Sequence, residues 1–413
     1  MIWRVAQPLQ QGSLYVLLFL LPFSKAIVSI AFGLLLLGWV LERWNPATRN
    51  HTVWASPRLR PLALAIGAYL AVCVLSIAVS DFPMLSLHGI RKWARALLSC
   101  MLIVEIATQP RVVGRGLKVL AWSSFCVAIV ALVQEVLDAL LRKEIIHGIL
   151  GEHPAHAFGR MTGPYENPID LATYLMVLIP VLLGFLTGCR GWRRLGVWAL
   201  LLTLTVCLAR TEAFGAWLGL GIGGLVLVGC GTVATRRRGL ILLLVGGFLG
   251  LAFLQSTGRV REIVSPSEIG KTDRWVMWQA ALGMIRDRPI LGHGVNTFMA
   301  NYLRYRVGGE RQPRYAHNCF LQVAAETGIL GLATFLWLLG ALAWLWWRAV
   351  HALKEQPHSR EILLGLGAGL LAFLAQSAID TNFYSLRQAA LFWTLAGLVV
   401  GMAATILPSP SRP

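Results

Sequence analysis

Residues 168–187 read PIDLATYLMVLIPVLLGFLT, and Asp170 is the only charged side chain among them. A helix of about this length crosses the hydrocarbon core of a bilayer, which is about 30 Å thick. Apolar runs of similar length recur along the whole 413-residue chain, and only 14% of its residues are charged. A soluble domain has roughly a quarter of its residues charged. The sequence therefore predicts an all-α polytopic membrane protein, because unbroken apolar runs do not fit the alternating strands of a β-barrel.

The apolar runs predict about twelve membrane-spanning helices. The first two are separated only by the segment from Pro22 to Lys25, and the fourth begins with the charged residues Arg91, Lys92 and Arg95. The predicted spans are 8–23, 26–42, 61–79, 88–107, 117–140, 168–187, 195–209, 212–230, 239–255, 319–346, 362–381 and 388–407.

Basic residues predict the orientation of these helices. The net charge is +18. If the predicted spans cross the membrane in turn, the short loops on one side hold much of this charge, whereas the short loops on the other side are poor in Lys and Arg. Cytoplasmic loops are enriched in Lys and Arg, so the basic side is predicted to be cytoplasmic, together with both termini. The positive charge therefore needs no nucleic acid to explain it. The basic loops are 42–60, 108–116, 188–194, 231–238 and 347–361.

The long polar segment 256–318 divides the chain into three parts. We expect helices 1–9 with short loops in 1–255, an outward-facing loop domain with amphipathic helices in 256–318, and helices 10–12 in 319–413. Segment 256–318 has ten Lys or Arg residues and five Asp or Glu residues. Attraction to anionic lipid headgroups is one explanation. The other is a pocket for phosphate or pyrophosphate, in which Arg offers paired donors that keep their charge.

Arg210 lies in the short predicted turn between spans seven and eight. An ionised Arg near hydrocarbon usually faces a water-filled cavity or a partner. It could instead extend to the headgroups or pair with Glu212. The predicted turn faces outward, as do segment 256–318, loop 141–167 and the turn 380–387, so these segments are expected to share one side.

His317 is predicted to lie at the N-terminal end of span ten. The positive end of a helix favours a neutral imidazole, which a general base requires. Glu326 lies more than two turns further along the same span. It could pair with an Arg of another span at least as easily as act in catalysis.

The stretch from Asp273 to Leu282 is predicted to begin an amphipathic helix with Arg274 in its first turn. The helix is expected to end at Asp287-Arg288-Pro289. Trp275 and Trp278 suit a helix that lies at a membrane interface.

One group of residues suggests a metal, but weakly. His147, Glu152, His153 and His156 cluster in loop 141–167, yet Pro154 breaks the helix that would place two His on one face. We therefore expect solvated histidines and no metal. The sequence contains no nucleotide-binding or zinc signature, so any transferase chemistry on the outer face must use a donor already activated and delivered within the membrane.

Four motifs, in this order and spacing, resemble those of the O-antigen ligase family, within the larger group of O-antigen polymerases and O-oligosaccharyltransferases. The overall plan of about twelve spans, with a large periplasmic loop between spans nine and ten, resembles that family too. The motifs are Gly163-x-x-x-Asn167-Pro168, Arg210 with Gly215 after it (where Ala209 replaces the family's Ser), Arg274-Trp275 through Pro289-x-x-Gly292-x-Gly294, and His317-Asn318 through Glu326-x-Gly328-x-x-Gly331.

The resemblance implies a GT-C-like glycosyltransferase of the bacterial inner membrane with a periplasmic active site. It implies transfer of O-antigen from undecaprenyl pyrophosphate to the lipid A-core, without a cofactor, metal or nucleotide. His317 matches the family's catalytic His, and Arg210 and Arg274 match its essential arginines near the donor pyrophosphate. The further predicted substrate-binding residues are Arg288, Arg314, Asn318, Asn167 and Arg160.

Three other functions remain open on the sequence. An O-antigen polymerase uses the same donor, so the motifs barely separate it from a ligase. A protein O-oligosaccharyltransferase often has an additional soluble region at its C-terminus. A lipid-linked glycan transporter, which is not an enzyme, would favour polar residues deep within several spans, whereas the unusual charges here lie at one face.

Overall fold

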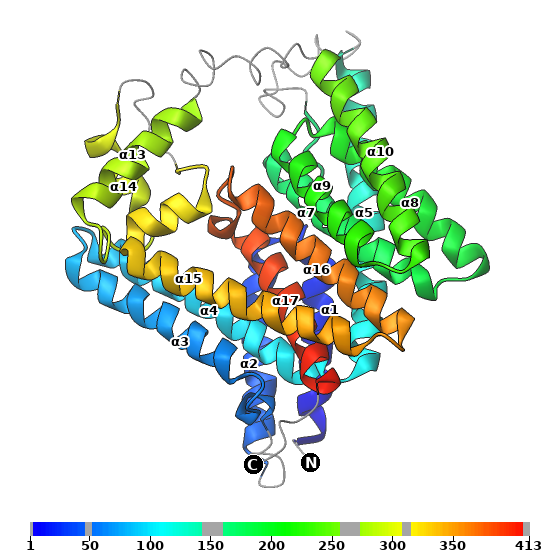
Figure 1. The fold of residues 1–413 in the computed structure, drawn as a ribbon, viewed down its shortest axis with the longest axis horizontal. Coiled ribbons are helices and arrows are strands. Elements are labelled where there is room, and N and C mark those ends of the chain that lie inside the picture. Colours follow the sequence, from blue (N-terminus) through cyan, green and yellow to red (C-terminus); the bar gives the residue numbers. More distant parts are fainter. Residues whose placement is uncertain (1–2, 46–51, 143–159, 257–272, 308–314, 408–413) are drawn as a thin grey trace.

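The computed structural model describes residues 3–45, 52–142, 160–256, 273–307 and 315–407. Helices dominate these residues (Figure 1). The twelve long helices are α1 (Trp3–Leu20), α2 (Lys25–Arg43), α3 (Arg60–Leu75), α4 (Pro83–Ala107), α5 (Pro110–Arg142), α7 (Pro168–Phe185), α8 (Gly191–Arg210), α9 (Phe214–Cys230), α10 (Val233–Ser256), α15 (Cys319–Ala352), α16 (Pro357–Ser377) and α17 (Leu386–Ile406).

Each predicted span coincides with one of these long helices. Eight helices among the described residues are long and apolar enough to cross a membrane, and α9 is a shorter apolar helix. The chain is therefore a multi-pass membrane protein. The total of twelve spans stays a prediction, since α1, α4, α9 and α10 are not among the eight. The eight candidates are Lys25–Arg43, Arg60–Val79, Pro110–Asp138, Pro168–Gly188, Gly191–Arg210, Cys319–Ala352, Pro357–Ser377 and Leu386–Ile406.

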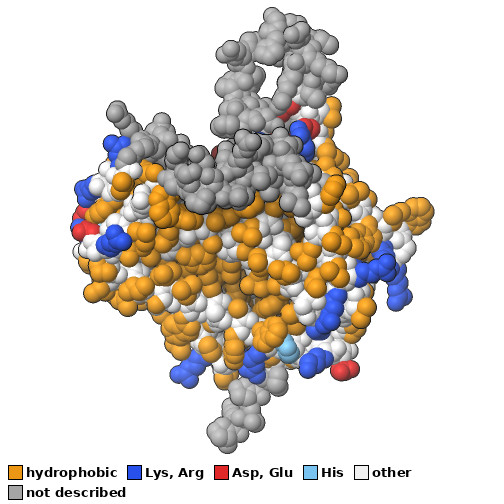
Figure 2. Space-filling model, turned by 45° about the horizontal axis from the view of Figure 1, so that its top comes forward, with side chains coloured by type: hydrophobic (Ala, Val, Ile, Leu, Met, Phe, Trp, Pro, Cys, Tyr) orange, Lys and Arg blue, Asp and Glu red, His pale blue; other side chains and the backbone are white. Residues whose placement is uncertain are grey.

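Helix α7 is the centre of the bundle. Other parts of the protein bury 83% of the residues in its most apolar stretch. It packs against α8, α9 and α16, while α17 packs along α4. The outer surface is different: Figure 2 shows hydrophobic side chains over much of the visible face, with Lys and Arg gathered toward its edges. An apolar surface of this kind suits contact with lipid.

Contacts between turns define one end of the bundle. The Arg387 guanidinium donates hydrogen bonds to the carbonyl oxygens of Pro22 (2.9 Å) and Pro164 (3.2 Å), so it joins three turns that are distant in sequence. His317 Nδ1 lies 3.3 Å from Asp380 Oδ1 in the turn before Arg387. We call this end of the molecule the His317 end.

The remaining turns meet at the opposite end. Arg58 Nη1 donates to the Ala404 carbonyl oxygen (2.8 Å), and the Thr232 backbone N–H donates to Glu361 Oε1 (2.9 Å). The first turn of α1 and the last turn of α17 also lie at this end (Figure 1). These contacts join turns that the sequence predicted to lie on the same side of the membrane. The assignment of this side to the cytoplasm stays a prediction.

Two shorter helices lie beside the bundle at the His317 end: α13 (Asp273–Asp287) and α14 (Phe298–Tyr305) (Figure 1). Helix α13 covers the range predicted for the amphipathic helix. Its buried face, with Met277, Ala281 and Met284, packs with Phe298 and Tyr302 of α14 into a second apolar core. This core gives the outer segment a fixed surface to present to the bundle.

Candidate functional site

His317 lies immediately before α15, as predicted. Asn318 is the N-cap of the helix, and its side-chain oxygen accepts hydrogen bonds from the backbone N–H groups of Phe320 and Leu321, each 3.0 Å long. His317 itself adopts a left-handed backbone conformation with φ 47°. A residue other than Gly pays a steric cost there, which is typical of functional sites.

The charged residue beside the His317 imidazole is Asp380. Its Oδ1 lies 3.3 Å from His317 Nδ1. The same oxygen accepts a 2.8 Å hydrogen bond from the Thr381 backbone N–H, and the Asp380 carbonyl oxygen accepts one from Cys319 Sγ at 3.2 Å. His317 Nδ1 is buried and forms no hydrogen bond among the described residues. A carboxylate this close still favours the tautomer with its proton on Nδ1, which leaves Nε2 able to accept a proton. The sequence placed Asp380 on this side but did not assign it to the site.

Below this pair, an aromatic cluster fixes the turn that follows Asp380. Phe383 lies in the 3₁₀ turn η5 (Asn382–Tyr384) and is almost fully buried. Its ring centroid lies 4.9 Å from that of Phe392 and 5.0 Å from that of Phe373. Such packing restricts the turn, and with it the position of Tyr384 on the other side of the same turn.

Arg210 is the last residue of α8 and forms an ion pair with Glu135 of α5. The alternative of a pair with Glu212 is therefore wrong, because Glu135, 75 positions away in sequence, is the partner. The Arg210 side chain is half exposed. Its carbonyl oxygen accepts a hydrogen bond from the Met161 backbone N–H (3.0 Å), so the α8–α9 turn and segment 160–167 do lie together.

Arg274 lies in the first turn of α13 and is partly exposed. Within the described ranges it forms no hydrogen bond or ion pair, and neither it nor Arg210 forms one with His317. In Figure 1, α13 lies on one flank of the His317 end and α8, α9 and α10 lie on the other. The predicted meeting of these three residues around one ligand stays a prediction.

Glu326 is buried within α15, and four donors surround its carboxylate. Oε2 accepts from the backbone N–H of Asn296 (2.7 Å) and from the Tyr384 hydroxyl (2.9 Å). Oε1 accepts from the backbone N–H of Phe298 (3.2 Å) and from Gln322 Nε2 (3.1 Å). The carboxylate thus joins the outer segment to α15 and η5. An Arg partner or a catalytic role was predicted for Glu326, but its hydrogen-bond partners are backbone N–H groups and neutral side chains.

Backbone pairing explains why glycines accompany Glu326 in the sequence. The N–H groups of His293 and Gly294 donate to the carbonyl oxygens of Ala325 (3.1 Å) and Glu326 (2.8 Å). Helix α15 breaks at Gly328, whose φ is 67°. A Cβ at Gly328 would lie 2.1 Å from the Ile290 carbonyl oxygen, so only glycine lets the two backbones come this close.

Arg288 ties the end of α13 to the bundle. It donates to the Val79 carbonyl oxygen and to Asp81 Oδ1 (3.0 Å), while Arg304 donates to Asp81 Oδ2 (2.7 Å). Arg288 was predicted to bind substrate. In the structure its guanidinium contacts the Val79 carbonyl oxygen and the Asp81 carboxylate, and substrate binding by Arg288 stays a prediction.

This cluster predicts a pH response. Hydrogen bonds from Arg288 and Arg304 hold the pKa of Asp81 below its ordinary value of 3.8. A carboxyl whose pKa is lower when folded stabilises the fold above its unfolded pKa, and that contribution is lost as the pH falls through the folded pKa. We expect residues 288–305 to lose protection against hydrogen exchange below about pH 4, when exchange is compared with the intrinsic rate at each pH. Arg288→Gln should cause the same loosening at neutral pH, whereas Arg286→Gln, which removes an exposed cation of the same helix, should not.

Asn167 and Arg160, two other predicted binding residues, form local hydrogen bonds, and their binding of substrate stays a prediction. The Asn167 side-chain oxygen caps α7 by accepting from the Ile169 N–H at 2.9 Å. Arg160 Nε donates to the Thr211 carbonyl oxygen at 2.8 Å. Arg314 lies outside the described residues, as do His147, Glu152, His153 and His156, the residues weighed for a metal.

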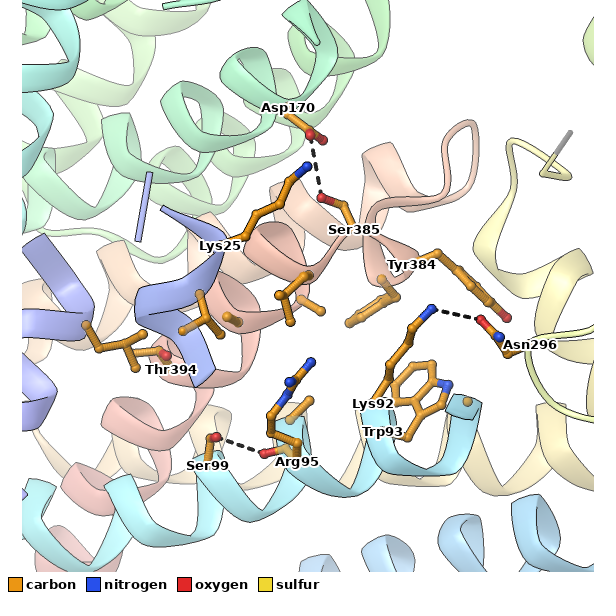
Figure 3. A pocket seen from close by; sticks show the side chains of 18 residues that line it. Lys25, Lys92, Trp93, Arg95, Ser99, Asp170, Asn296, Tyr384, Ser385 and Thr394 are labelled. Atoms are coloured by element: carbon orange, nitrogen blue, oxygen red, sulfur yellow. Dashed lines mark hydrogen bonds between the residues drawn. The ribbon is translucent and has the colours of Figure 1, made fainter. Parts of the chain in front are cut away.

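A cavity of about 360 Å³ lies between α2, α4, α7 and α17 beside the turn η5. Three cations, Lys25, Lys92 and Arg95, line it together with one carboxylate, that of Asp170 (Figure 3). Lys92 donates to Asn296 Oδ1 (3.1 Å) and Arg95 donates to Ser29 Oγ (3.1 Å), so both contact neutral partners. Among the described residues, neither of these two forms an ion pair with a carboxylate.

Tyr384 connects this cavity with the His317 region. It lines the cavity, donates to Glu326, and its ring centroid lies 5.7 Å from that of Tyr315, two residues before His317. In the sequence, Lys25, Lys92 and Arg95 interrupt or border apolar runs and were not assigned to a site. Charged residues within a span usually face the interior of a bundle, so those interruptions were the signal for the cavity.

Comparison with known proteins gives one family similarity. Residues 198–336 match the family model described as O-antigen ligase, whose members are glycosyltransferase-like membrane enzymes. A search of curated proteins returned no match. The matched region runs from α8 into α15 and contains Arg210, Arg274 and His317. Residues 198–336, about a third of the chain, are thus similar to the O-antigen ligase family that the motifs resemble.

Proposed function

We propose that the protein is an O-antigen ligase of the bacterial inner membrane. It transfers O-antigen polysaccharide from undecaprenyl pyrophosphate to a sugar of the lipid A-core on the periplasmic side, with both termini in the cytoplasm. The observation that carries the proposal is the pair of cations, Lys92 and Arg95, in the cavity beside η5, whose lining also includes the Asp170 carboxylate. Lys92 and Arg95 project into the cavity without a carboxylate partner (Figure 3), and an anionic group of the donor would supply the missing charge.

The proposed chemistry is a direct displacement. The acceptor hydroxyl attacks C1 of the donor sugar while His317 Nε2 takes its proton. The bond between C1 and the pyrophosphate oxygen breaks, and the electron pair leaves with the lipid pyrophosphate. Fixed cations that face this developing charge stabilise the transition state more than the ground state. One displacement inverts the configuration at C1.

Arg210 and Arg274 stay proposed donor contacts. Arg274 has a guanidinium that no described partner occupies, and Arg210 is half exposed beside its Glu135 partner. A polyprenyl diphosphate bearing a polysaccharide is much larger than the cavity. Contacts from both flanks of the His317 end are therefore compatible with one extended donor.

Reconstitution tests the reaction. Purified protein is mixed with lipid-linked O-antigen and rough lipopolysaccharide, in EDTA and without nucleotide. Polysaccharide joined to lipid A-core supports the ligase. Longer chains that stay on the carrier lipid would identify a polymerase instead, and no covalent product in either form would contradict a transferase.

A charge variant tests the cavity in the same assay. We expect Arg95→Gln to lower kcat/KM for transfer about 100-fold, since removing one donor to a developing oxyanion has an effect of this order. Arg91→Gln is the matched control, because Arg91 is exposed on the same helix and does not line the cavity. If Arg95→Gln and Arg91→Gln have the same kcat/KM for transfer, the cavity has no part in the reaction.

A further inference from the structure

A second cavity, of about 530 Å³, lies near the opposite end of the bundle from His317. It is formed by α5, α8 and the turn that joins α7 to α8. Its walls include Trp122, whose side chain is largely exposed, and Leu200. Since it opens on the apolar outer surface, the groove faces the region where lipid chains lie in a membrane.

The two helices present matching stripes to this groove. On each helix the lining positions are spaced by three, one and three residues, which places them on a single helical face. Each stripe begins with a cation, Lys118 on α5 and Arg193 on α8, and continues with small or apolar residues. Over seven residues a stripe extends about 10 Å. The stripes are Lys118, Ala121, Trp122 and Phe125 on α5, and Arg193, Gly196, Val197 and Leu200 on α8.

The two cations converge at one end of the groove. Burial raises the pKa of the Cys189 thiol, and the charges of Arg193 and Lys118 both act in the opposite direction, so both cations lie near this one thiol. No Asp or Glu residue is among the described residues that line the groove. The groove therefore has a positive end without a counter-ion and an apolar remainder.

We propose that this groove binds one molecule of an anionic phospholipid. The phosphate lies between Lys118 and Arg193, and an acyl chain follows the apolar stripes past Trp122 and Leu200. The match is one of charge and polarity: basic side chains between helix ends bind anionic headgroups, whereas an apolar groove accepts a chain. This site is separate from the proposed glycan transfer and does not depend on it.

Two variants test the groove through different properties. Lys118→Gln with Arg193→Gln removes both charges. Gly196→Trp leaves the charges in place but fills the groove, because an added Cβ at Gly196 meets no atom within 4 Å. The matched control is Arg237→Gln with Lys354→Gln, which removes two exposed cations from the same end of the molecule.

Native mass spectrometry of the full chain, titrated with phosphatidylglycerol or phosphatidylcholine, measures binding. We expect wild type and the control to retain one phosphatidylglycerol in preference to phosphatidylcholine. The charge variant should bind it roughly thirtyfold more weakly, and Gly196→Trp should lose it. Thermal unfolding checks that each variant is folded. Equal retention of the two lipids, undiminished binding by Gly196→Trp, or equal loss in the control would each overturn the proposal.

Discussion

His317→Ala is expected to reduce glycan transfer by about 10² to 10⁴-fold, the range in which a general base contributes to catalysis. The imidazole lies at the start of α15 with Asp380 Oδ1 3.3 Å from Nδ1, so Nε2 is the nitrogen available to the acceptor hydroxyl. The measurement is single-turnover transfer from lipid-linked glycan to the lipid A-core at saturating substrates. The acceptor then stays bound, and only the proton-transfer step is removed.

Two further variants make this result specific. His88→Ala is the control, because His88 is an exposed histidine at the start of α4 whose Nδ1 contacts only its own helix, at the Met84 carbonyl oxygen (2.8 Å). It should transfer at the wild-type rate. Asp380→Asn removes the orienting charge but keeps the base, so its loss should be smaller than that of His317→Ala. Full activity of His317→Ala would exclude the imidazole from the reaction.

Glu326→Ala should cause the largest loss of stability. The substitution removes the acceptor for the backbone N–H groups of Asn296 and Phe298 and for Gln322 Nε2. Each buried donor left unpaired costs about 1–3 kcal/mol. We therefore expect a clearly lower midpoint of thermal unfolding and faster proteolysis within residues 288–305.

A comparison with Glu355→Ala separates this effect from a general response to losing a glutamate. Glu355 is exposed at the opposite end of the molecule, and its removal should leave unfolding and proteolysis unchanged. If Glu326→Ala unfolds at the wild-type temperature but transfers no glycan, then the carboxylate acts in the reaction, and its structural role is secondary.

Local patterns in the sequence predicted much of the fold. The range of α13 and the position of His317 before a helix follow from an amphipathic period and from Asn318, since both depend on residues within a few positions of one another. The twelve long helices follow from apolar length alone. Their ends do not: α5 starts at Pro110 rather than at residue 117, because a helix continues past the hydrocarbon boundary through basic residues.

The site was predicted less completely because its contacts are distant in sequence. Glu135 as the partner of Arg210, and Asp380 beside His317, depend on how helices pack. Lys25, Lys92 and Arg95 come from two helices that the sequence alone does not place together. Glu326 was misjudged for the same reason: a search for a charged partner misses a carboxylate that accepts from the backbone of a folded turn.

The pairing of residues 289–294 with 325–330 has a consequence for how this region can evolve. Its hydrogen bonds run between main-chain atoms of His293 and Ala325 and of Ile329 and Pro289, so they exist whatever side chains those positions carry. Gly292 and Gly328 are different, since a methyl group at either would collide with the opposing chain. A saturation library over this region should therefore tolerate broad replacement at some positions and permit almost none at the two glycines.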